Sequence, residues 1–255
     1  MRRFAVAALA SLLALAAACG GERPEITVAA ASDLRGALEE VAAAYQRGCE
    51  CRVQFSFGSS GNLATQIRGG LPVDAFFSAD EGFVDGLIAD GLLLPDSRTV
   101  YARGRLALAV PAGSDLKPRS LDDLRDSRVR RIAIANPEHA PYGAAARQAL
   151  AAAGVWDEVE PKLVLGENAS QATQFVETGN AQAGILPLSL AIQNQRLRFV
   201  DIDESLYEPL RQAAAVLKRS GHPELARAFI EFVAGPQGRK IMEQYGFLPP
   251  REEAS

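Results

Sequence analysis

Cysteine, histidine and tryptophan are scarce in this sequence, with three, two and one residues among 255. The histidines, His139 and His222, are far apart and each lies close to a proline, so the sequence gives little support for a zinc or copper site. Cys49 and Cys51 could close a small disulfide, or bind a metal if other residues supplied ligands. We interpret this pair as structural or incidental.

An excess of charge is also absent, because the net charge at pH 7 is −4 and charged residues make up 23% of the chain. With 48% hydrophobic residues, this is the composition of an ordinary globular protein, which argues against disorder and against nucleic-acid binding. The mild acidity gives no global attraction for an anion, so any anion site would have to be formed locally.

Long apolar runs are missing apart from residues 4–18, a stretch too short to span a membrane. Two arginines precede it, and this order predicts an export signal over residues 1–18 that is not part of the fold. Small residues in front of Cys19 resemble the lipobox of bacterial lipoproteins. We therefore expect lipidation of Cys19, a tether over residues 19–24 and a location in the periplasm or cell envelope. Cleavage without lipidation, to give a soluble periplasmic protein, is the alternative.

Strand-like and helix-like stretches alternate along the remaining chain. Residues 26–31 form a short β run, and apolar residues at helical spacing follow over 34–45. The same order repeats at 53–57 and 63–67, and a third unit covers 75–91. This alternation predicts an α/β fold with a mostly parallel sheet flanked by helices.

A second series of the same kind begins after residues 101–111, and two helices close the chain. Two α/β series joined by extended segments predict two lobes with a ligand cleft between them. Closure of the cleft would be a hinge motion near residues 101–104 and 211–214.

The turns that open the helices are rich in small and polar residues. Five of them contain neither Lys nor Arg: AAASD (29–33), GSSGN (58–62), SADEG (78–82), HAPYG (139–143) and ENAS (167–170). Unpaired N–H groups and a positive dipole end make such helix starts into anion sites without a full positive charge. A fully ionised tetrahedral oxyanion needs donors only, and serine hydroxyls can rotate to donate. Taken singly, each turn has a simpler explanation, in which Ser32, Ser59 or Ser60 merely caps its helix.

Several motifs follow one another in a specific order: ITVAAASDL, SFGSSGNLATQI, PVDAFFSAD, NPEHAPYG, GENASQATQFVETGNAQAGI and YGFLPP. In this order they resemble the ModA-type family of periplasmic molybdate-binding proteins of ABC importers, from about residue 26 to residue 250. The resemblance implies a type II periplasmic binding protein fold, in which two α/β lobes close on the anion. It places lobe I at residues 25–103 plus 214–251 and lobe II at residues 104–213.

The family holds its oxyanion with serine hydroxyls and backbone amides. The resemblance carries these roles over to six residues: Ser32, Asp33, Ser60, Ala79, Tyr142 and Ala169. The serine-hydroxyl role carries over first to Ser60, the last serine of the SFGSS turn. Ungapped alignment puts Asp33 where many members have a ligand serine, so we take the Ser32 hydroxyl as the ligand and the Asp33 amide as a second donor. Tyr142 and Ala169 would donate their backbone amides.

Two positions depart from the family pattern. Some members supply a tyrosine hydroxyl where this chain has Pro187, so that contact is lost or replaced by Ser189. A carboxylate at Asp33 would repel a dianion but could accept from a partly protonated phosphate. We expect Asp33 to cap its own helix with its carboxylate turned away, which leaves a donor-only site that favours molybdate, tungstate or sulfate. An inward carboxylate would favour phosphate.

The sequence therefore predicts a monomeric binding protein without a cofactor, and no enzyme, which captures molybdate or tungstate and delivers it to an ABC permease in the inner membrane. The same fold could instead bind sulfate, phosphate or a small organic anion, because fold alone does not choose a ligand. A secreted hydrolase, with Ser59 or Ser60 as nucleophile and His139 or His222 as base, is a hypothesis of another class. It is disfavoured because GSSGN lacks the last glycine of the G-x-S-x-G elbow and neither histidine has an evident orienting partner.

Overall fold

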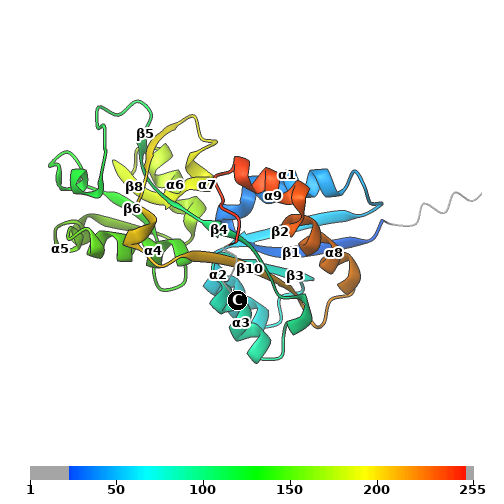
Figure 1. Cartoon of the computed structure of the whole chain (residues 1–255). Helices are drawn as coiled ribbons and strands as arrows, with labels where there is room; N and C mark the ends of the chain where they lie inside the picture. Colours follow the sequence, from blue (N-terminus) through cyan, green and yellow to red (C-terminus); the bar gives the residue numbers. More distant parts are fainter. Residues whose placement is uncertain (1–22, 251–255) are drawn as a thin grey trace, which may run out of the picture.

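The computed structural model describes residues 23–250, which form two α/β lobes side by side (Figure 1). Both lobes have a five-stranded sheet with helices packed on its two faces. The expected two-lobed α/β architecture is confirmed. No helix within residues 23–250 has the length and apolar character needed to cross a membrane.

Lobe I is built from both ends of the described chain. Its strands are β1 (Glu25–Ala31), β2 (Arg52–Gly58), β3 (Ala75–Ser78), β4 (Thr99–Gly104) and β10 (Leu210–Val216), in the sheet order β2-β1-β3-β10-β4. Its helices are η1 (Ser32–Leu34), α1 (Arg35–Tyr45), α2 (Ser60–Arg68), α3 (Glu81–Ala89), η2 (Pro95–Ser97), α8 (Pro223–Ala234) and α9 (Pro236–Gln244). Helices α2 and α3 cover one face of the sheet, and α1, α8 and α9 cover the other (Figure 1).

Lobe II comes from the middle of the chain. Its strands are β5 (Leu106–Pro111), β6 (Ile132–Ala135), β7 (Leu163–Gly166), β8 (Ala183–Pro187) and β9 (Leu197–Asp201), in the sheet order β7-β6-β8-β5-β9. Its helices are η3 (Leu121–Arg125), α4 (Pro141–Ala152), α5 (Trp156–Val159), η4 (Glu160–Lys162), α6 (Ala169–Glu177) and α7 (Leu188–Ala191). Helices α4 and α6 pack on opposite faces of this sheet.

The strands at the centre of lobe I are apolar on both sides because both faces of the sheet are covered. Successive side chains of a strand point to opposite faces. In β1, Val28 and Ala30 therefore belong to the core under α1 and α8, whereas Ala29 belongs to the core under α2 and α3. In β3, Phe77 and Phe76 divide in the same way.

Each sheet is mixed rather than parallel throughout. In lobe I, β1, β2 and β3 are parallel, and β10 is antiparallel to β3 and β4. In lobe II, β6, β7 and β8 are parallel, and β5 is antiparallel to β8 and β9. The reason lies in the two crossings between lobes: β5 and β10 begin at a crossing and run away from the cleft, whereas the parallel strands end at it.

The crossings lie at other positions than the sequence indicates. Arg105 alone joins β4 to β5, and residues 202–209, which include η5 (Glu204–Leu206), join β9 to β10. The segments 101–104 and 211–214, expected to be hinges, instead pair with each other as neighbouring strands of lobe I. The expected lobe boundary between residues 213 and 214 falls inside β10. No cluster of turn residues separates β4 from β5, so the sequence pattern does not mark the end of the first sheet.

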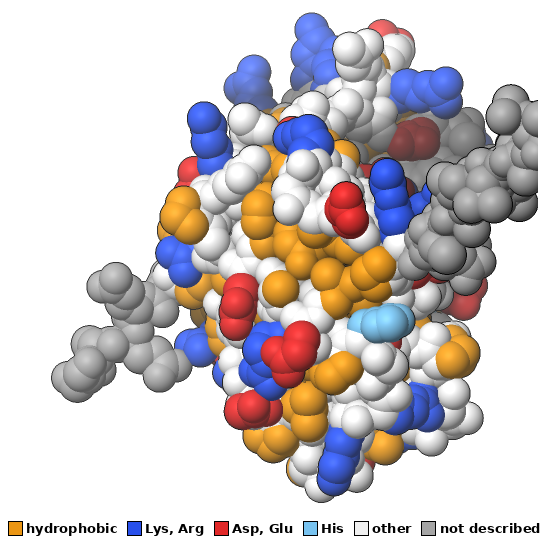
Figure 2. All heavy atoms as spheres, turned by 90° about the vertical axis from the view of Figure 1, so that its right-hand side faces the viewer, with side chains coloured by type: hydrophobic (Ala, Val, Ile, Leu, Met, Phe, Trp, Pro, Cys, Tyr) orange, Lys and Arg blue, Asp and Glu red, His pale blue; other side chains and the backbone are white. Residues whose placement is uncertain are grey.

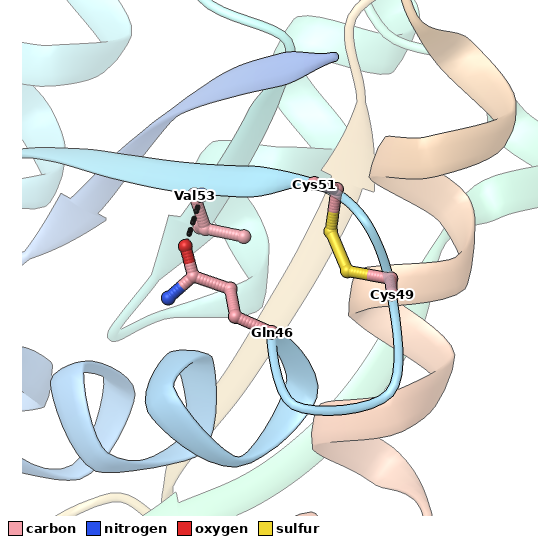
Figure 3. The surroundings of a disulfide bond; sticks show 4 residues. All are labelled: Gln46, Cys49, Cys51 and Val53. Atoms are coloured by element: carbon pink, nitrogen blue, oxygen red, sulfur yellow. Dashed lines mark hydrogen bonds between the residues drawn. A yellow bond between two sulfur atoms is a disulfide. The ribbon is translucent and has the colours of Figure 1, made fainter. Parts of the chain in front are cut away.

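Cys49 and Cys51 form a disulfide in the turn between α1 and β2 (Figure 3). Beside it, the Gln46 side-chain oxygen accepts a hydrogen bond from the Val53 N–H at 3.0 Å, which fixes the start of β2 (Figure 3). Of the two alternatives that the sequence left open for this pair, the structure therefore shows the disulfide. Within residues 23–250, no group of three or more His, Cys, Asp and Glu side chains could hold a metal ion. The predicted signal segment, Cys19 and most of the tether lie outside the described residues.

The end face of lobe I carries intermixed charges. Figure 2 shows the end of the molecule at which lobe I lies, where basic and acidic side chains alternate with apolar ones and no field of one sign covers the face. This face therefore offers no broad attraction for an anion, in agreement with the small net charge.

Candidate functional site

The carboxyl ends of the parallel strands of the two lobes face each other. Hydrogen bonds join the lobes at these ends, between Gly61 and His139, Ser32 and Ser170, and Asp33 and Ser189. The turns that the sequence singled out therefore meet at one interface, where a ligand is expected in this class of fold.

Ser32 is the first residue of η1 and is buried. Its hydroxyl oxygen accepts from the Ser170 N–H at 3.3 Å, and its carbonyl accepts from the Ser170 hydroxyl at 3.2 Å. Because the hydroxyl oxygen acts as the acceptor, the hydroxyl proton of Ser32 is left for a further acceptor. Neither η1 nor α1 has a side-chain cap, so the simpler explanation, in which Ser32 merely caps its helix, is wrong.

Asp33 does not cap its helix either, so its expected capping role is wrong, whereas the orientation of its carboxylate relative to the anion stays a prediction. The carboxylate accepts from Gln212 Nε2 at 2.8 Å, and only 2% of the residue is exposed. The reason is that η1 precedes α1, which moves the N-cap of α1 to Leu34 and leaves Asp33 inside the first turn. Burial raises the pKa of Asp33 from 3.8 to about 6, although hydrogen bonds with Gln212 and Tyr142 oppose the rise.

Ser60 is the first residue of α2 and is completely buried. The cap of this helix is the preceding Ser59, whose hydroxyl oxygen accepts from the Asn62 N–H at 3.4 Å. Ser60 is therefore not needed as a cap, and its hydroxyl oxygen accepts from the Ala79 N–H at 3.0 Å. This contact brings together two predicted site residues from the ends of β2 and β3. It also leaves the Ser60 hydroxyl proton for another acceptor.

His139 joins lobe II to the start of α2. Its carbonyl accepts from the Gly61 N–H at 2.9 Å, and its Nδ1 lies 3.0 Å from the Ser59 hydroxyl oxygen. A Cβ atom at position 61 would lie 2.8 Å from the same carbonyl oxygen, so glycine is required for this approach of the lobes. The contact of Ser59 with His139 is one that the hydrolase hypothesis needs. Within residues 23–250, however, no carboxylate hydrogen-bonds the other ring nitrogen of His139, so a triad is not formed.

Tyr142 occupies the second position of α4, after Pro141. A backbone N–H at this position has no carbonyl one turn earlier in the helix, which suits the predicted amide donor. The hydroxyl of Tyr142 reaches lobe I, where it accepts from Gln212 Nε2 at 3.1 Å and lies near the Asp33 carboxylate, which the same Gln212 amide contacts. Burial, together with the nearby Asp33 charge, raises the pKa of Tyr142 well above its usual value, so the phenol stays protonated.

Ala169 begins α6 and is buried. The N-cap Asn168 accepts from the Gln171 N–H at 3.0 Å, and the Ser170 N–H is bonded to Ser32. Of the first three amides of α6, the one that these contacts leave over is that of Ala169, as its predicted role requires.

Ser189 does not replace the missing tyrosine contact at Pro187. Its hydroxyl donates to the Asp33 carbonyl at 2.8 Å, so its proton is already used. Ser189 lies in α7, directly after β8, and therefore joins lobe II to η1.

Gln212 and Tyr101 complete a buried network that sequence reasoning missed. Gln212 is fully buried in β10, and its Oε1 accepts from the Tyr101 hydroxyl at 3.0 Å. A signal was present in the sequence, because Gln212 interrupts the small apolar run of LRQAAAV. A polar side chain in a covered strand needs partners, and those partners lie at the lobe interface.

A cleft of about 320 Å³ lies beside this interface, lined by Asp80, Gly82, Phe83, Ala144 and residues 137–141. It is formed by the start of α3 from lobe I and the start of α4 from lobe II. Ala79 and Tyr142 are neighbours of its lining residues in sequence but are not part of the lining. The cleft therefore adjoins the predicted ligand residues without including them.

Comparisons with known proteins agree with this geometry. A family model described as bacterial extracellular solute-binding protein matches residues 26–248. The molybdate-binding protein ModA of Azotobacter vinelandii is 34% identical over 97% of this chain and 97% of its own length. The protein of the same name from Rhodobacter capsulatus is 35% identical over 94% of this chain and 93% of its own. The solved structure of the Azotobacter vinelandii periplasmic molybdate-binding protein superposes with a TM-score of 0.80 at 31% identity, covering 89% of this chain and 100% of that one.

Proposed function

The chain belongs to the family of bacterial extracellular solute-binding proteins, and within it to the ModA-type proteins, and from this premise we propose that it binds molybdate or tungstate and delivers the anion to an ABC permease. The observation that carries the proposal is that helix starts from both lobes, which contain neither Lys nor Arg, meet at one interface. Neutral donors hold a dianion without the cost of burying a lysine or arginine beside it.

The anion would be held by two hydroxyls and several amides. Ser32 and Ser60 each have a hydroxyl proton that their other contacts leave for an acceptor. The amide donors are Asp33 from lobe I and Tyr142 and Ala169 from lobe II. The Ala79 N–H, the further donor expected from lobe I, instead donates to the Ser60 hydroxyl oxygen and so orients that hydroxyl toward the anion. Because the donors come from both lobes, full coordination requires a closed cleft. The extent of closure would therefore depend on the size of the anion.

The location and partners follow from the same family. A periplasmic or envelope protein of this kind meets its permease at the inner membrane as a monomer. Lipidation of Cys19 would tether it there, with residues 19–24 as the link between the lipid and β1. The chemistry is binding and release, without a bond made or broken.

Isothermal titration with molybdate, tungstate, sulfate and phosphate tests the proposal. We expect tight binding of the first two and weak binding of sulfate, which contacts fewer donors in the same cavity. Ser60→Ala should weaken molybdate binding by roughly 1 to 3 kcal/mol, the cost of one donor to a charged group. Ser56→Ala is the matched control, because Ser56 lies in β2, the strand before Ser60, and none of the side-chain hydrogen bonds among residues 23–250 involves its hydroxyl. Equal affinities for Ser60→Ala and the unaltered protein would refute the assignment of this turn.

The buried carboxylate of Asp33, which lies among the predicted ligand residues in sequence, gives a second ligand a specific basis. A partly protonated phosphate could donate to this carboxylate, whereas a dianion is repelled by it unless the carboxyl group is protonated. The titration with phosphate decides between phosphate and molybdate as the ligand. If phosphate binds more tightly than molybdate, and Asp33→Asn loses this binding, then phosphate and not molybdate is the ligand.

The contact of Ser59 with His139 gives the hydrolase hypothesis one observation in its favour. Ser59 also caps α2, which accounts for the serine without catalysis. Incubation with a fluorophosphonate probe separates the two roles, because stoichiometric labelling of Ser59 or Ser60 would require an activated nucleophile. We expect no labelling.

A further inference from the structure

The hydroxyl of Tyr142 crosses from lobe II into a buried pocket of lobe I. The wall of this pocket includes Gly104, the last residue of β4. A Cβ atom at position 104 would lie 2.1 Å from the Tyr142 hydroxyl oxygen and 2.9 Å from Gln212 Nε2. No side chain other than hydrogen fits there, so the pocket exists because residue 104 is a glycine.

Lobe I presents a complete set of partners to this hydroxyl. Gln212 Nε2 donates to the Asp33 carboxylate at 2.8 Å and to the Tyr142 hydroxyl at 3.1 Å, which uses both of its protons. The Gln212 oxygen accepts from Tyr101 at 3.0 Å, so the amide is held from both sides. Gln212 leaves the Tyr142 proton unused, and the Asp33 carboxylate, which shares the Gln212 amide with Tyr142, is placed to accept it.

We propose that the Tyr142 hydroxyl is a latch that holds the lobes closed over the bound anion, with Asp33, Gln212 and Gly104 as its socket. The inference rests on the proposed function, because it assigns the side chain of Tyr142 a role apart from the backbone amide that would touch the anion. Tyr142 is thus a positioning residue through its side chain.

The latch acts on closure and not on the folding of either lobe. When the lobes are apart, water can reach the socket and the phenol. When they close, both become dry, and the Tyr142 hydroxyl is then the partner of one Gln212 proton and of the Asp33 carboxylate. Without it, those two groups are buried with fewer partners, a cost that arises only in the closed form. Closing therefore becomes less favourable while each separate lobe is unaffected.

The test is the rate at which molybdate leaves Tyr142→Phe. This variant keeps the backbone amide and the ring, and it removes only the hydroxyl. We expect dissociation about tenfold faster, which corresponds to about 1.4 kcal/mol, and an unchanged association rate, because encounter precedes closure. A chase of labelled molybdate with excess unlabelled molybdate measures the first rate. Gly104→Ala, which blocks the socket and keeps the tyrosine, should act in the same direction.

Tyr245→Phe is the matched control. It removes a phenol hydroxyl that hydrogen-bonds Glu40 at 3.1 Å within lobe I. We expect its dissociation rate to equal that of the unaltered protein. A Tyr142→Phe variant that releases molybdate no faster than this control would overturn the latch.

Small-angle scattering distinguishes failure of the latch from failure of the proposed function. Tyr142→Phe should show a larger radius of gyration than the unaltered protein, with and without molybdate, because the open form is more populated. If the unaltered protein binds none of the four anions, the proposed function fails and scattering still tests the latch. Equal radii for the two proteins would overturn it.

Discussion

Replacing Asp33 by Asn should change how the stability of the protein depends on pH. Asn has the shape of Asp and can still accept from Gln212, but it does not titrate. Burial raises the pKa of the Asp33 carboxyl from 3.8 to about 6 in the folded protein. A group with a raised folded-state pKa contributes stability that is fully present below its unfolded pKa and is lost as the pH rises through its folded pKa. The unaltered protein should therefore lose stability relative to Asp33→Asn as the pH rises.

The magnitude follows from the two pKa values. At about 1.4 kcal/mol for each pH unit, the interval from 3.8 to about 6 corresponds to about 3 kcal/mol. About 2.5 kcal/mol of this is lost between about pH 4 and pH 7.5, because some ionisation in the unfolded chain has already occurred at the lower limit. Asp33 is only 2% exposed, so solvent screening does not reduce the effect appreciably.

Urea denaturation at several pH values, followed by circular dichroism, measures this difference. The quantity to plot is the free energy of unfolding of the unaltered protein minus that of Asp33→Asn. Asp157→Asn, at an exposed position on α5, is the control for the loss of one carboxylate outside the interface. If the Asp33 and Asp157 variants give the same dependence on pH, the burial argument for Asp33 is wrong.

Two further substitutions separate closure from folding. Gly61→Ala should weaken molybdate binding at least tenfold because its Cβ meets the His139 backbone at 2.8 Å, while the free energy of unfolding stays equal or rises by up to about 1 kcal/mol from helix propensity. Titration calorimetry and urea denaturation measure the two effects, and Gly86→Ala in α3 is the control that should change stability alone. Cys49→Ser should lower the free energy of unfolding by about 1.6 kcal/mol, the loop-closure value for a three-residue ring, in non-reducing urea titrations. It should leave molybdate affinity unchanged, because the seven residues of β2, about 23 Å of extended strand, separate the disulfide from Ser59; a loss of binding would contradict this.

The sequence predicts the α/β alternation well because each strand and helix of lobe I carries its own periodicity. Phe76 and Phe77 show how a covered strand is apolar on both sides, and Ser60 lies where a strand ends and a helix begins. Such signals are local, and local signals can be read without knowing the partner segment. The same holds for the turns that meet at the site, since each was recognisable by its small residues and its position before a helix.

Contacts between distant segments escaped this reasoning. The orientation of Asp33 depends on Gln212, which is 179 positions away, and on a short 3-10 turn that shifts the N-cap of α1 to Leu34. The role of the Tyr142 hydroxyl depends on the missing Cβ at Gly104. The crossing at Arg105 escaped for a different reason, because two strands follow each other there without a turn signal between them.

The order of strands in lobe I has a consequence for how the protein matures. β10 lies between β3 and β4, although it is the last strand of the described chain. The first hundred residues therefore cannot complete their sheet until nearly the whole polypeptide has emerged, whereas all five strands of the other lobe are contiguous from Leu106 to Asp201. During synthesis, lobe II could accordingly fold first, whereas lobe I would stay incomplete until β10 is available.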